Sequence, residues 1–174
     1  MKKSQLIFAL FTSIVVSMTT LFTSMARADF TEGKNALQVD FGVTDGGPSL
    51  GVEFENGYQK TYGIGGYFRI DPDSQTNHVT GYTTVGGFIR PHFNRAPWDF
   101  YVSPGFGLTF VKRGDGRGNE TCLGPSWAVG VLYDFNANMA FGFESLTQVA
   151  WFTSSSDYRG PLTTDYTARF RFVF

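Results

Sequence analysis

The stretch that decides the fold is the last nine residues, Tyr-Thr-Ala-Arg-Phe-Arg-Phe-Val-Phe (166–174). Its side chains alternate in character, as they do along a β-strand, where successive residues point to opposite faces. One face carries Tyr166, Ala168, Phe170, Phe172 and Phe174, and the other carries Thr167, Arg169, Arg171 and Val173. A strand of a water-soluble protein turns its apolar face to a core and its polar face to water. Here the aromatic face fits contact with lipid, and the arginines fit the interior of a closed barrel.

The N-terminus has the pattern of an export signal. Residues 1–3 (Met-Lys-Lys) are positively charged, and residues 6–22 are mostly apolar. Residues 26–28 (Ala-Arg-Ala) place alanine at the two positions that an export peptidase reads. We therefore expect residues 1–28 to be a cleaved signal peptide and residues 29–174 to form one domain, the barrel. A retained transmembrane helix is the alternative, but the apolar stretch is short and contains many hydroxyl groups.

The composition of the expected mature chain excludes several classes. Cleavage leaves 146 of the 174 residues and removes Lys2, Lys3 and Arg27, so 11 basic residues remain against 15 acidic ones, a net charge of −4. This balance gives no basic excess for nucleic acid. Cys122 is the one cysteine of the chain, so no internal disulfide can form, and we expect it at the edge of a loop. The 19 Phe, 8 Tyr and 21 Gly suit a barrel with aromatic girdles and a crowded interior.

Eight alternating segments separated by turn signals make up the expected mature chain. They are residues 37–43, 50–55, 61–70, 79–90, 100–112, 126–135, 139–152 and 166–174. An even number of strands of about ten residues, with both chain ends on one side, is what a single-chain membrane barrel needs. The sequence therefore predicts an all-β fold, an eight-stranded antiparallel up-and-down transmembrane β-barrel.

The phase of the fourth segment, 79–90, is ambiguous. We favour the phase that turns Arg90 inward. That phase places three aliphatic side chains against lipid: Val79, Val85 and Ile89. The other phase would place Tyr82 and Phe88 there.

Two further segments carry signs of irregularity. Pro104 lies inside the fifth segment, where it predicts a bulge or a local break, because proline cannot donate to a ladder. The alternation of the seventh segment is lost after Ser145, which favours a bulge there.

Charged side chains collect on the inner faces if the apolar faces point outward. An unpaired charge in a narrow interior is costly, so these groups must pair. Eight strands leave an interior about wide enough for side chains alone. We therefore expect a lumen plugged by a charge network of Asp40, Glu53, Glu55, Arg69, Glu144, Arg169 and Arg171, with Arg90 and Asp134 towards the end that holds the termini. A small or gated channel lined by the same charges is the alternative.

Several segments resemble a known family. Residues 99–110 (DFYVSPGFGLTF), 127–135 (WAVGVLYDF) and 141–144 (FGFE) are similar to strands of small outer-membrane barrels of the OmpA-like, OmpX and opacity-protein superfamily. The terminal strand resembles the signal that the outer-membrane assembly machinery reads, through Tyr166, Phe170, Phe172 and Phe174. The resemblance covers the whole mature chain, but unrelated activities share this barrel.

The resemblance implies an integral protein of the outer membrane of a Gram-negative bacterium, with both termini in the periplasm. Residues 44–49, 71–78, 113–123 and 153–162 would then be outer loops, and residues 56–60, 91–99 and 136–138 would be periplasmic turns. The implied partners are outer-membrane lipids and lipopolysaccharide, the assembly machinery and periplasmic chaperones, and the protein would be a monomer. We expect a non-enzymatic, structural or cell-surface role.

Lipid A modification is the enzymatic alternative, because some eight-stranded barrels of this kind carry it out. A hydrolase of that type needs a histidine paired with a hydroxyl nucleophile. The chain has two histidines, His78 and His92, and we place His92 in a periplasmic turn. The deacylase pattern puts a serine two residues after the histidine, where this chain has Thr80, and Gly81 stands where asparagine should follow. We expect no catalytic residues, no metal site and no cofactor.

One outer loop offers a binding feature. Lys112, Arg113 and Arg117 lie where lipopolysaccharide phosphates would be, and guanidinium groups pair well with phosphate. The alternative is a solvated loop held together by Asp115 and Glu120.

Overall fold

The computed structural model describes residues 32–44, 47–72, 79–114, 118–153 and 160–174, and these form β-strands joined by short turns. Among them there is no helix with the length and hydropathy needed to cross a membrane. The expected signal peptide, residues 1–28, lies outside the described residues.

The strands are long, and most exceed ten residues. They are β1 (Asn35–Thr44), β2 (Gly47–Gln59), β3 (Tyr62–Pro72), β4 (Val79–Arg95), β5 (Trp98–Arg113), β6 (Glu120–Asn136), β7 (Met139–Ala150), β8 (Phe152–Thr153) and β9 (Gly160–Val173).

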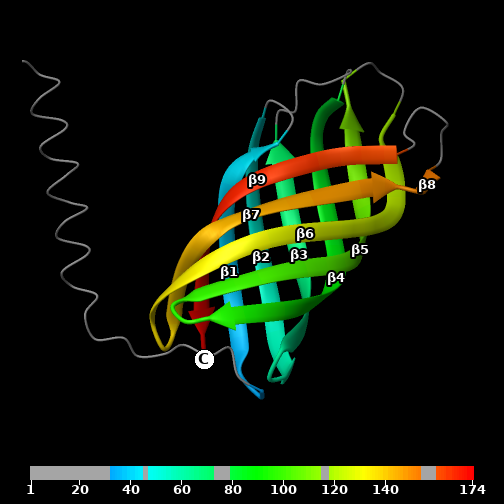
Figure 1. The fold of residues 1–174 in the computed structure, drawn as a ribbon. Coiled ribbons are helices and arrows are strands. Elements are labelled where there is room, and N and C mark those ends of the chain that lie inside the picture. Colours follow the sequence, from blue (N-terminus) through cyan, green and yellow to red (C-terminus); the bar gives the residue numbers. More distant parts are fainter. Residues whose placement is uncertain (1–31, 45–46, 73–78, 115–117, 154–159) are drawn as a thin grey trace, which may run out of the picture.

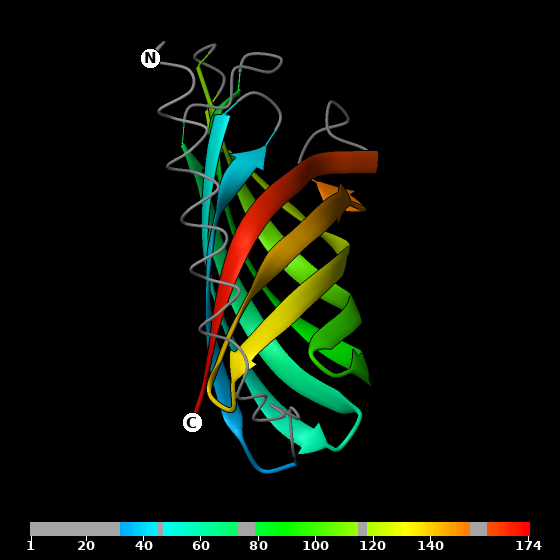
Figure 2. The same ribbon diagram turned by 60° about the vertical axis from the view of Figure 1, so that its left-hand side comes forward.

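The strands form one closed ring. Neighbours pair antiparallel in the order β5-β4-β3-β2-β1-β9-β7-β6, and β6 also pairs with β5, which closes the barrel. The short β8 pairs with β6 just beyond the end of β7, so β7 and β8 act as one strand of the wall. Figures 1 and 2 show the strands running steeply around a single barrel, with the C-terminus at the end that carries the turns after β2, β4 and β6. The predicted eight-stranded antiparallel up-and-down barrel is confirmed.

The stagger of the strands sets the width of the barrel. The stagger can be read by following paired residues around the ring from Val39. In one direction, through β9, β7 and β6, the pairs end at Trp98 of β5. The paired residues on β2, β3 and β4 lead instead to Leu108 of the same strand, ten residues away. For eight strands, such a stagger corresponds to a strand tilt of about 40° and an interior that side chains can fill.

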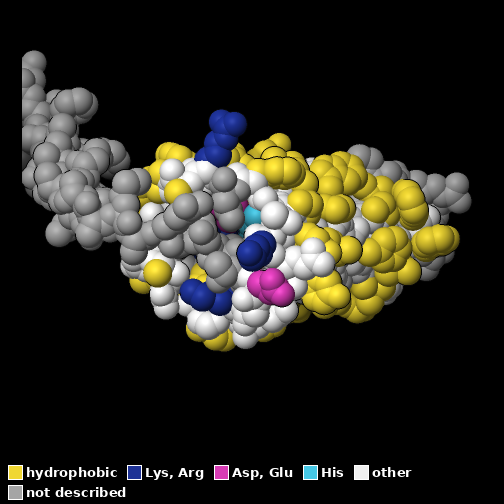
Figure 3. Space-filling model, turned by 60° about the horizontal axis from the view of Figure 1, so that its bottom comes forward, with side chains coloured by type: hydrophobic (Ala, Val, Ile, Leu, Met, Phe, Trp, Pro, Cys, Tyr) yellow, Lys and Arg dark blue, Asp and Glu magenta, His cyan; other side chains and the backbone are white. Residues whose placement is uncertain are grey.

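Burial alternates along the strands with the polarity reversed from that of a soluble barrel. On β1 and β9, Asp40 and Arg169 are fully buried, whereas Phe41 and Phe170 are exposed by 51% and 39%. The outer wall is covered by apolar side chains, seen in yellow along the barrel in Figure 3. An apolar exterior around a polar interior is the arrangement of a membrane-spanning barrel.

Glycines on the inner wall make room for aromatic rings. A Cβ added at Gly130 would overlap the ring of Tyr101, and one added at Gly86 would overlap the ring of Tyr67. Both tyrosines are almost completely buried. The high glycine content therefore serves interior packing, as the composition suggests.

The strands extend further than the sequence pattern predicts. The expected turn at 91–99 is reduced to residues 96 and 97, and the rest is strand. The expected loop at 113–123 is also shorter, because β6 already begins at Glu120. Cys122 therefore lies within a strand and is fully buried, so its predicted position at a loop edge is wrong. Main-chain pairing with the neighbouring strands decides where these strands begin and end. The alternation of side chains within one segment carries no information on that pairing.

The favoured phase of β4 is confirmed for most of the strand. Val85 and Ile89 are exposed, and Arg90 is buried. Val79 is the exception, because it is buried while the favoured phase places it outside. The β4–β5 register shifts between Val79 and Gly81, and such a shift turns the preceding side chain to the other face.

Both predicted irregularities are present. The β4–β5 ladder has no paired residues between the pairs Phe88–Gly105 and His92–Tyr101, and Pro104 lies in that gap. The pairing of β7 with β9 shifts between Gln148 and Val149, a few residues after Ser145.

Candidate functional site

Arg169 of β9 lies at the centre of the barrel. Its guanidinium group contacts Asp40 at 2.6 and 2.9 Å, Glu53 at 2.6 Å and Glu144 at 2.7 Å. It also donates to the Tyr101 hydroxyl at 2.9 Å. The side chain is completely buried. One guanidinium therefore links carboxylates from β1, β2 and β7.

Arg69 of β3 binds the same three carboxylates from another side. Its distances to the oxygens of Asp40, Glu53 and Glu144 are 3.3, 3.1 and 2.5 Å. A fourth contact, at 3.3 Å, reaches Asp165 of β9. Each of the three shared carboxylates thus lies between two buried arginines.

Arg90 of β4 extends the network towards the end of the barrel that carries the turns after β2, β4 and β6, which we call the turn end (Figure 1). It contacts Glu53 at 2.6 Å and Glu55 at 2.8 Å, and its Nε donates to the Ser103 hydroxyl at 2.6 Å. Its guanidinium carbon lies 4.1 Å from the ring centre of Phe88 and 4.5 Å from that of Tyr101. Such stacking suits arginine because its planar group is only weakly hydrated.

A second cluster lies closer to the termini. Arg171 of β9 contacts Asp99 at 2.5 Å and Asp134 at 2.8 Å. His92 of β4 lies between Asp99 and Glu55, 2.9 and 2.8 Å from their carboxylate oxygens. Glu55 joins the two clusters because it also binds Arg90. The network is therefore continuous along much of the lumen.

Apolar clusters lie inside the barrel above and below the charged network. One joins Val79, Tyr82, Val111 and Cys122 with Ala150, and Leu162 packs against it. Ala36 and Val173 form another near the termini. The lumen therefore combines an ionic network with small apolar clusters.

All seven residues predicted for the lumen network lie in the interior. These are Asp40, Glu53, Glu55, Arg69, Glu144, Arg169 and Arg171. Five of them pair directly with one another, whereas Glu55 and Arg171 join the network through Arg90, His92 and Asp99. The structure adds Gln38, Asp99, Tyr101 and Asp165, which the prediction omitted, and His92, which it assigned to a turn. Asp99, Tyr101 and Ser103 alternate with apolar residues along β5. This alternation could have placed Asp99 and Tyr101 inside the barrel together with Ser103.

The acidic oxygens of Asp40, Glu53 and Glu144 lie within 4.8 Å of one another, close enough to share a cation. Arg69 and Arg169 each contact all three. The guanidinium groups already supply the positive charge and the hydrogen bonds that these oxygens need. The donor set therefore does not fit a resident metal ion.

The residues of the expected assembly signal lie on the outer wall. Tyr166 and Phe174 are exposed by 62% and 65%, and Phe170 and Phe172 by 39% each. The last residue is tied to the first strand, because Asn35 and Phe174 exchange backbone hydrogen bonds of 2.9 and 2.8 Å.

The three basic residues considered for phosphate contact are placed differently. Lys112 is exposed at the end of β5, whereas Arg113 is half-buried and pairs with Glu120. Arg117 lies outside the described residues.

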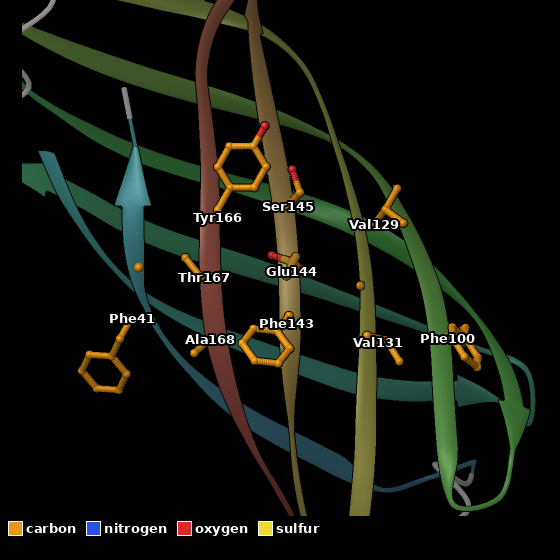
Figure 4. A pocket seen from close by; sticks show the side chains of 12 residues that line it. Phe41, Phe100, Val129, Val131, Phe143, Glu144, Ser145, Tyr166, Thr167 and Ala168 are labelled. Atoms are coloured by element: carbon orange, nitrogen blue, oxygen red, sulfur yellow. The ribbon is translucent and has the colours of Figure 1, made fainter. Parts of the chain in front are cut away.

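An apolar groove of about 690 Å³ crosses the outer wall over β1, β9, β7, β6 and β5. Figure 4 shows Ala168 between the larger side chains of Phe41 and Phe143, with Ser145 and Tyr166 in the next row. The Glu144 side chain that borders the groove is itself buried in the lumen network. The groove therefore offers hydrocarbon contact and no reactive constellation.

No protein-family model and no curated protein matches the chain. Solved structures do match. The N-terminal β-barrel domain of Pseudomonas aeruginosa OprF has a TM-score of 0.66 at 12% identity, covering 82% of this chain and 98% of that one. Neisserial surface protein A (NspA) has a TM-score of 0.57 at 12% identity, covering 81% and 95%.

The attachment invasion locus protein Ail of Yersinia pestis also matches. In its complex with the heparin analogue sucrose octasulfate it has a TM-score of 0.53 at 10% identity, and the two chains are covered by 83% and 100%. At these identities the likeness concerns the fold, and it agrees with the closed ring and the apolar exterior. The chain therefore has the fold of the small eight-stranded outer-membrane β-barrels.

Proposed function

We propose that the protein is a non-enzymatic integral protein of the outer membrane of a Gram-negative bacterium, with a structural or cell-surface role and a closed lumen. The observation that carries the proposal is the interior network, in which Arg69, Arg90 and Arg169 are at most 1% exposed and bind shared carboxylates. Side chains that fill the interior in this way leave no continuous path for solute.

Planar-bilayer recording tests the closed lumen against the alternative of a small or gated channel. The purified, folded protein should give no opening events above those of protein-free bilayers. Reproducible unitary conductance at constant pH would overturn the closed lumen. An Arg169→Ala, Glu144→Ala variant serves as the comparison, because it removes the central links and is expected to admit ions.

Lipid A analysis tests the absence of enzymatic activity. Both ring nitrogens of His92 lie against carboxylates, whereas a nucleophilic site of this kind pairs a histidine nitrogen with a hydroxyl group. His78 lies outside the described residues. Mass spectra of lipid A from overexpressing and control cells should be identical, and a new or missing acyl chain would contradict the proposal.

The proposed orientation places the N- and C-termini and the turns after β2, β4 and β6 in the periplasm. In a Cys122→Ser background, a single cysteine at Asn119 should react with a membrane-impermeant maleimide in intact cells. One at Lys60 should react only after the outer membrane is opened. The folded protein should also fractionate with the outer membrane and migrate faster on gels before heating than after.

The proposed partners are outer-membrane lipids and lipopolysaccharide, together with the assembly machinery and periplasmic chaperones during biogenesis. The protein would act as a monomer. The C-terminal strand with Tyr166, Phe170, Phe172 and Phe174 would be read before it pairs with β1. A Phe174→Ala variant should accumulate in the periplasm more than a Phe143→Ala variant, which changes an outer-wall phenylalanine elsewhere.

Lys112, Arg113 and Arg117 are proposed to contact lipopolysaccharide phosphates. The exposure of Lys112 supports this, and the pairing of Arg113 with Glu120 makes it the weakest contributor. Ail, which shares the fold, was solved with a polysulfated ligand. A Lys112→Gln, Arg117→Gln variant should retain less lipopolysaccharide on purification, whereas Lys34→Gln, Lys60→Gln at the other end should retain as much as the wild type.

A further inference from the structure

His92 occupies an unusual position near the turn end of the lumen. Its Nε2 lies 2.8 Å from a carboxylate oxygen of Glu55 on β2. Its Nδ1 lies 3.0 and 2.9 Å from the two oxygens of Asp99 on β5. The side chain has no exposed surface. Through its two nitrogens the ring thus links β2 to β5, which are separated in the wall by β3 and β4.

With both carboxylates ionised, the hydrogen-bond count calls for two protons on this ring. A neutral imidazole has one N–H donor and one acceptor, and an ionised carboxylate only accepts. A neutral His92 would therefore direct one lone pair at a carboxylate oxygen in a dry interior. The imidazolium, with two N–H donors, satisfies both contacts and adds a positive charge where carboxylates are in excess.

The surrounding charged groups support this assignment. Glu55 also accepts from Arg90 on β4 and from the Gln38 amide on β1. Asp99 accepts from Arg171 on β9, which also binds Asp134 on β6. From β5, the Tyr101 ring lies 5.9 Å from the His92 ring, and the backbone N–H of His92 donates to Thr61, just before β3. The seven carboxylates of the two clusters face four arginines, so a fifth cation reduces the imbalance.

Next to His92 the pairing of β4 with β5 is interrupted, while the pairing of β4 with β3 continues. The β4–β5 ladder is interrupted between Phe88–Gly105 and His92–Tyr101, although the register is the same on both sides. Pro91 and Pro104 lie in this gap, and proline has no N–H to donate. The Arg90–Ser103 bond crosses the gap. His92 stands in the first residue pair beyond the gap, and its side chain is bonded to Asp99, two residues before Tyr101 on β5. We call residues 88–92 and 101–105 the proline seam.

We propose that His92 is a proton-dependent latch that holds the proline seam closed while its ring carries two protons. Loss of one proton turns a hydrogen bond into a repulsive contact with Glu55 or Asp99. The seam then opens locally, because the positions between the Phe88–Gly105 and His92–Tyr101 pairs have no β4–β5 ladder pairing to hold them. The latch makes the turn end of the barrel wall sensitive to pH above neutrality.

The latch lies four residues before the turn at residues 96 and 97 that joins β4 to β5. Figure 3 looks at the turn end and shows a histidine side chain at the bottom of a hollow, with Lys and Arg side chains around it. His92 is the one histidine among the described residues. Its position lies on the side that the proposed orientation assigns to the periplasm, but the latch itself does not depend on that orientation.

Hydrogen exchange tests the latch in the full-length folded protein in lipid vesicles. All variants carry Cys122→Ser, which removes the one cysteine of the chain. Amides of the proline seam should lose about tenfold or more of their protection between pH about 6 and about 9, after correction for intrinsic exchange. Peptides from β1 and β9 should keep theirs.

Two variants decide the outcome. His92→Gln cannot carry the second proton, so its seam should be weakly protected at both pH values and show no pH step. His78→Ala, which changes the other histidine, should behave as the wild type. Equal seam protection at both pH values, or the same step in His92→Gln, would overturn the proposal.

Nitrogen NMR of selectively labelled histidine gives a second test that needs no substitution of His92. At pH about 7, the His92 ring should show two protonated nitrogens, and the signal should change over the same pH range as seam protection. A neutral ring at pH about 7 in the folded protein would contradict the latch even if His92→Gln failed to fold.

Discussion

At the residue scale, Arg169 shows why the interior charges are tolerated. Three carboxylates, Asp40, Glu53 and Glu144, would each be strongly disfavoured in a dry lumen without a cation. The planar guanidinium bonds to all three and to the Tyr101 hydroxyl. Removing one member of such a group costs more than the bond itself, because the remaining charges stay buried.

Arg169→Met should therefore lower the free energy of unfolding by about 3–5 kcal/mol. Methionine keeps much of the length of the side chain, so the loss reports the missing charge. The measurement is urea unfolding in phospholipid vesicles followed by tryptophan fluorescence. Lys112→Met, at an exposed position, should stay within about 0.5 kcal/mol of the wild type. An unchanged midpoint for Arg169→Met would mean that the network does not stabilise the barrel.

Cys122 provides a second test at this scale. It is fully buried in the apolar cluster with Val79, Tyr82 and Val111. A thiol in such surroundings reacts slowly, because reagents cannot reach it and the thiolate is disfavoured. Maleimide labelling of the folded barrel should be at least about tenfold slower than labelling of the urea-unfolded chain. A cysteine placed at exposed Lys112 in a Cys122→Ser background should label at similar rates in both states, and rapid labelling of folded Cys122 would contradict its burial.

At the element scale, the inner and outer faces of each strand follow different packing rules. Inside, tyrosine rings lie flat across glycines of neighbouring strands, as Tyr101 of β5 does over Gly130 of β6. Outside, the glycine positions border lipid, and Gly87 of β4 has only the Gly65 carbonyl oxygen nearby. The same residue type is therefore needed for space on one face and is replaceable on the other.

Gly130→Ala should destabilise the folded barrel by about 1–3 kcal/mol, because its methyl group would overlap the Tyr101 ring and displace it from Glu144 and Arg169. Gly87→Ala is the matched control, since an added Cβ would lie 3.5 Å from the nearest atom, an ordinary contact. Urea midpoints of the two variants measure the difference. Equal midpoints would show that the interior is looser than the packing indicates.

The limits of sequence reasoning also appear at this scale. Alternation placed Glu53, Arg69 and Arg169 on inner faces, where they lie. It missed His92, because Pro91 and the polar residues after it resembled a turn. His92 belongs to β4 because it pairs with Tyr101 on the neighbouring strand β5. A contact between strands decides that assignment, and no single segment contains the information.

At the scale of the whole molecule, the exterior is the feature that requires a membrane. Large apolar side chains are exposed on every long strand, among them Phe54, Phe68, Phe106, Trp127 and Val129. In water such a surface would drive association. In a bilayer it is the stable outer face. In the part of the chain that the structure describes, every long strand of the closed ring has a paired neighbour on both sides, as hydrocarbon requires.

Val129→Arg tests this arrangement. Val129 is 56% exposed on the outer wall of β6, a position where a soluble barrel would accept arginine at almost no cost. In lipid vesicles the variant should lose about 2–4 kcal/mol of unfolding free energy if the position lies near the bilayer midplane. Val129→Leu should be close to neutral. A neutral Val129→Arg would place this part of the wall outside the hydrocarbon.

The sequence by itself determined the number of strands, the closed antiparallel ring and the inward direction of the charged side chains. These follow from a two-residue period and from the two environments that a membrane barrel offers, so each segment carries its own evidence. Only the tertiary structure decided which carboxylate meets which arginine, the ten-residue stagger of the ring, the burial of Cys122 and the bridge from His92 to Glu55 and Asp99. The physical reason is that those contacts join residues far apart in sequence. Strand register and tilt bring them together, and register is set by the pairing of the whole ring.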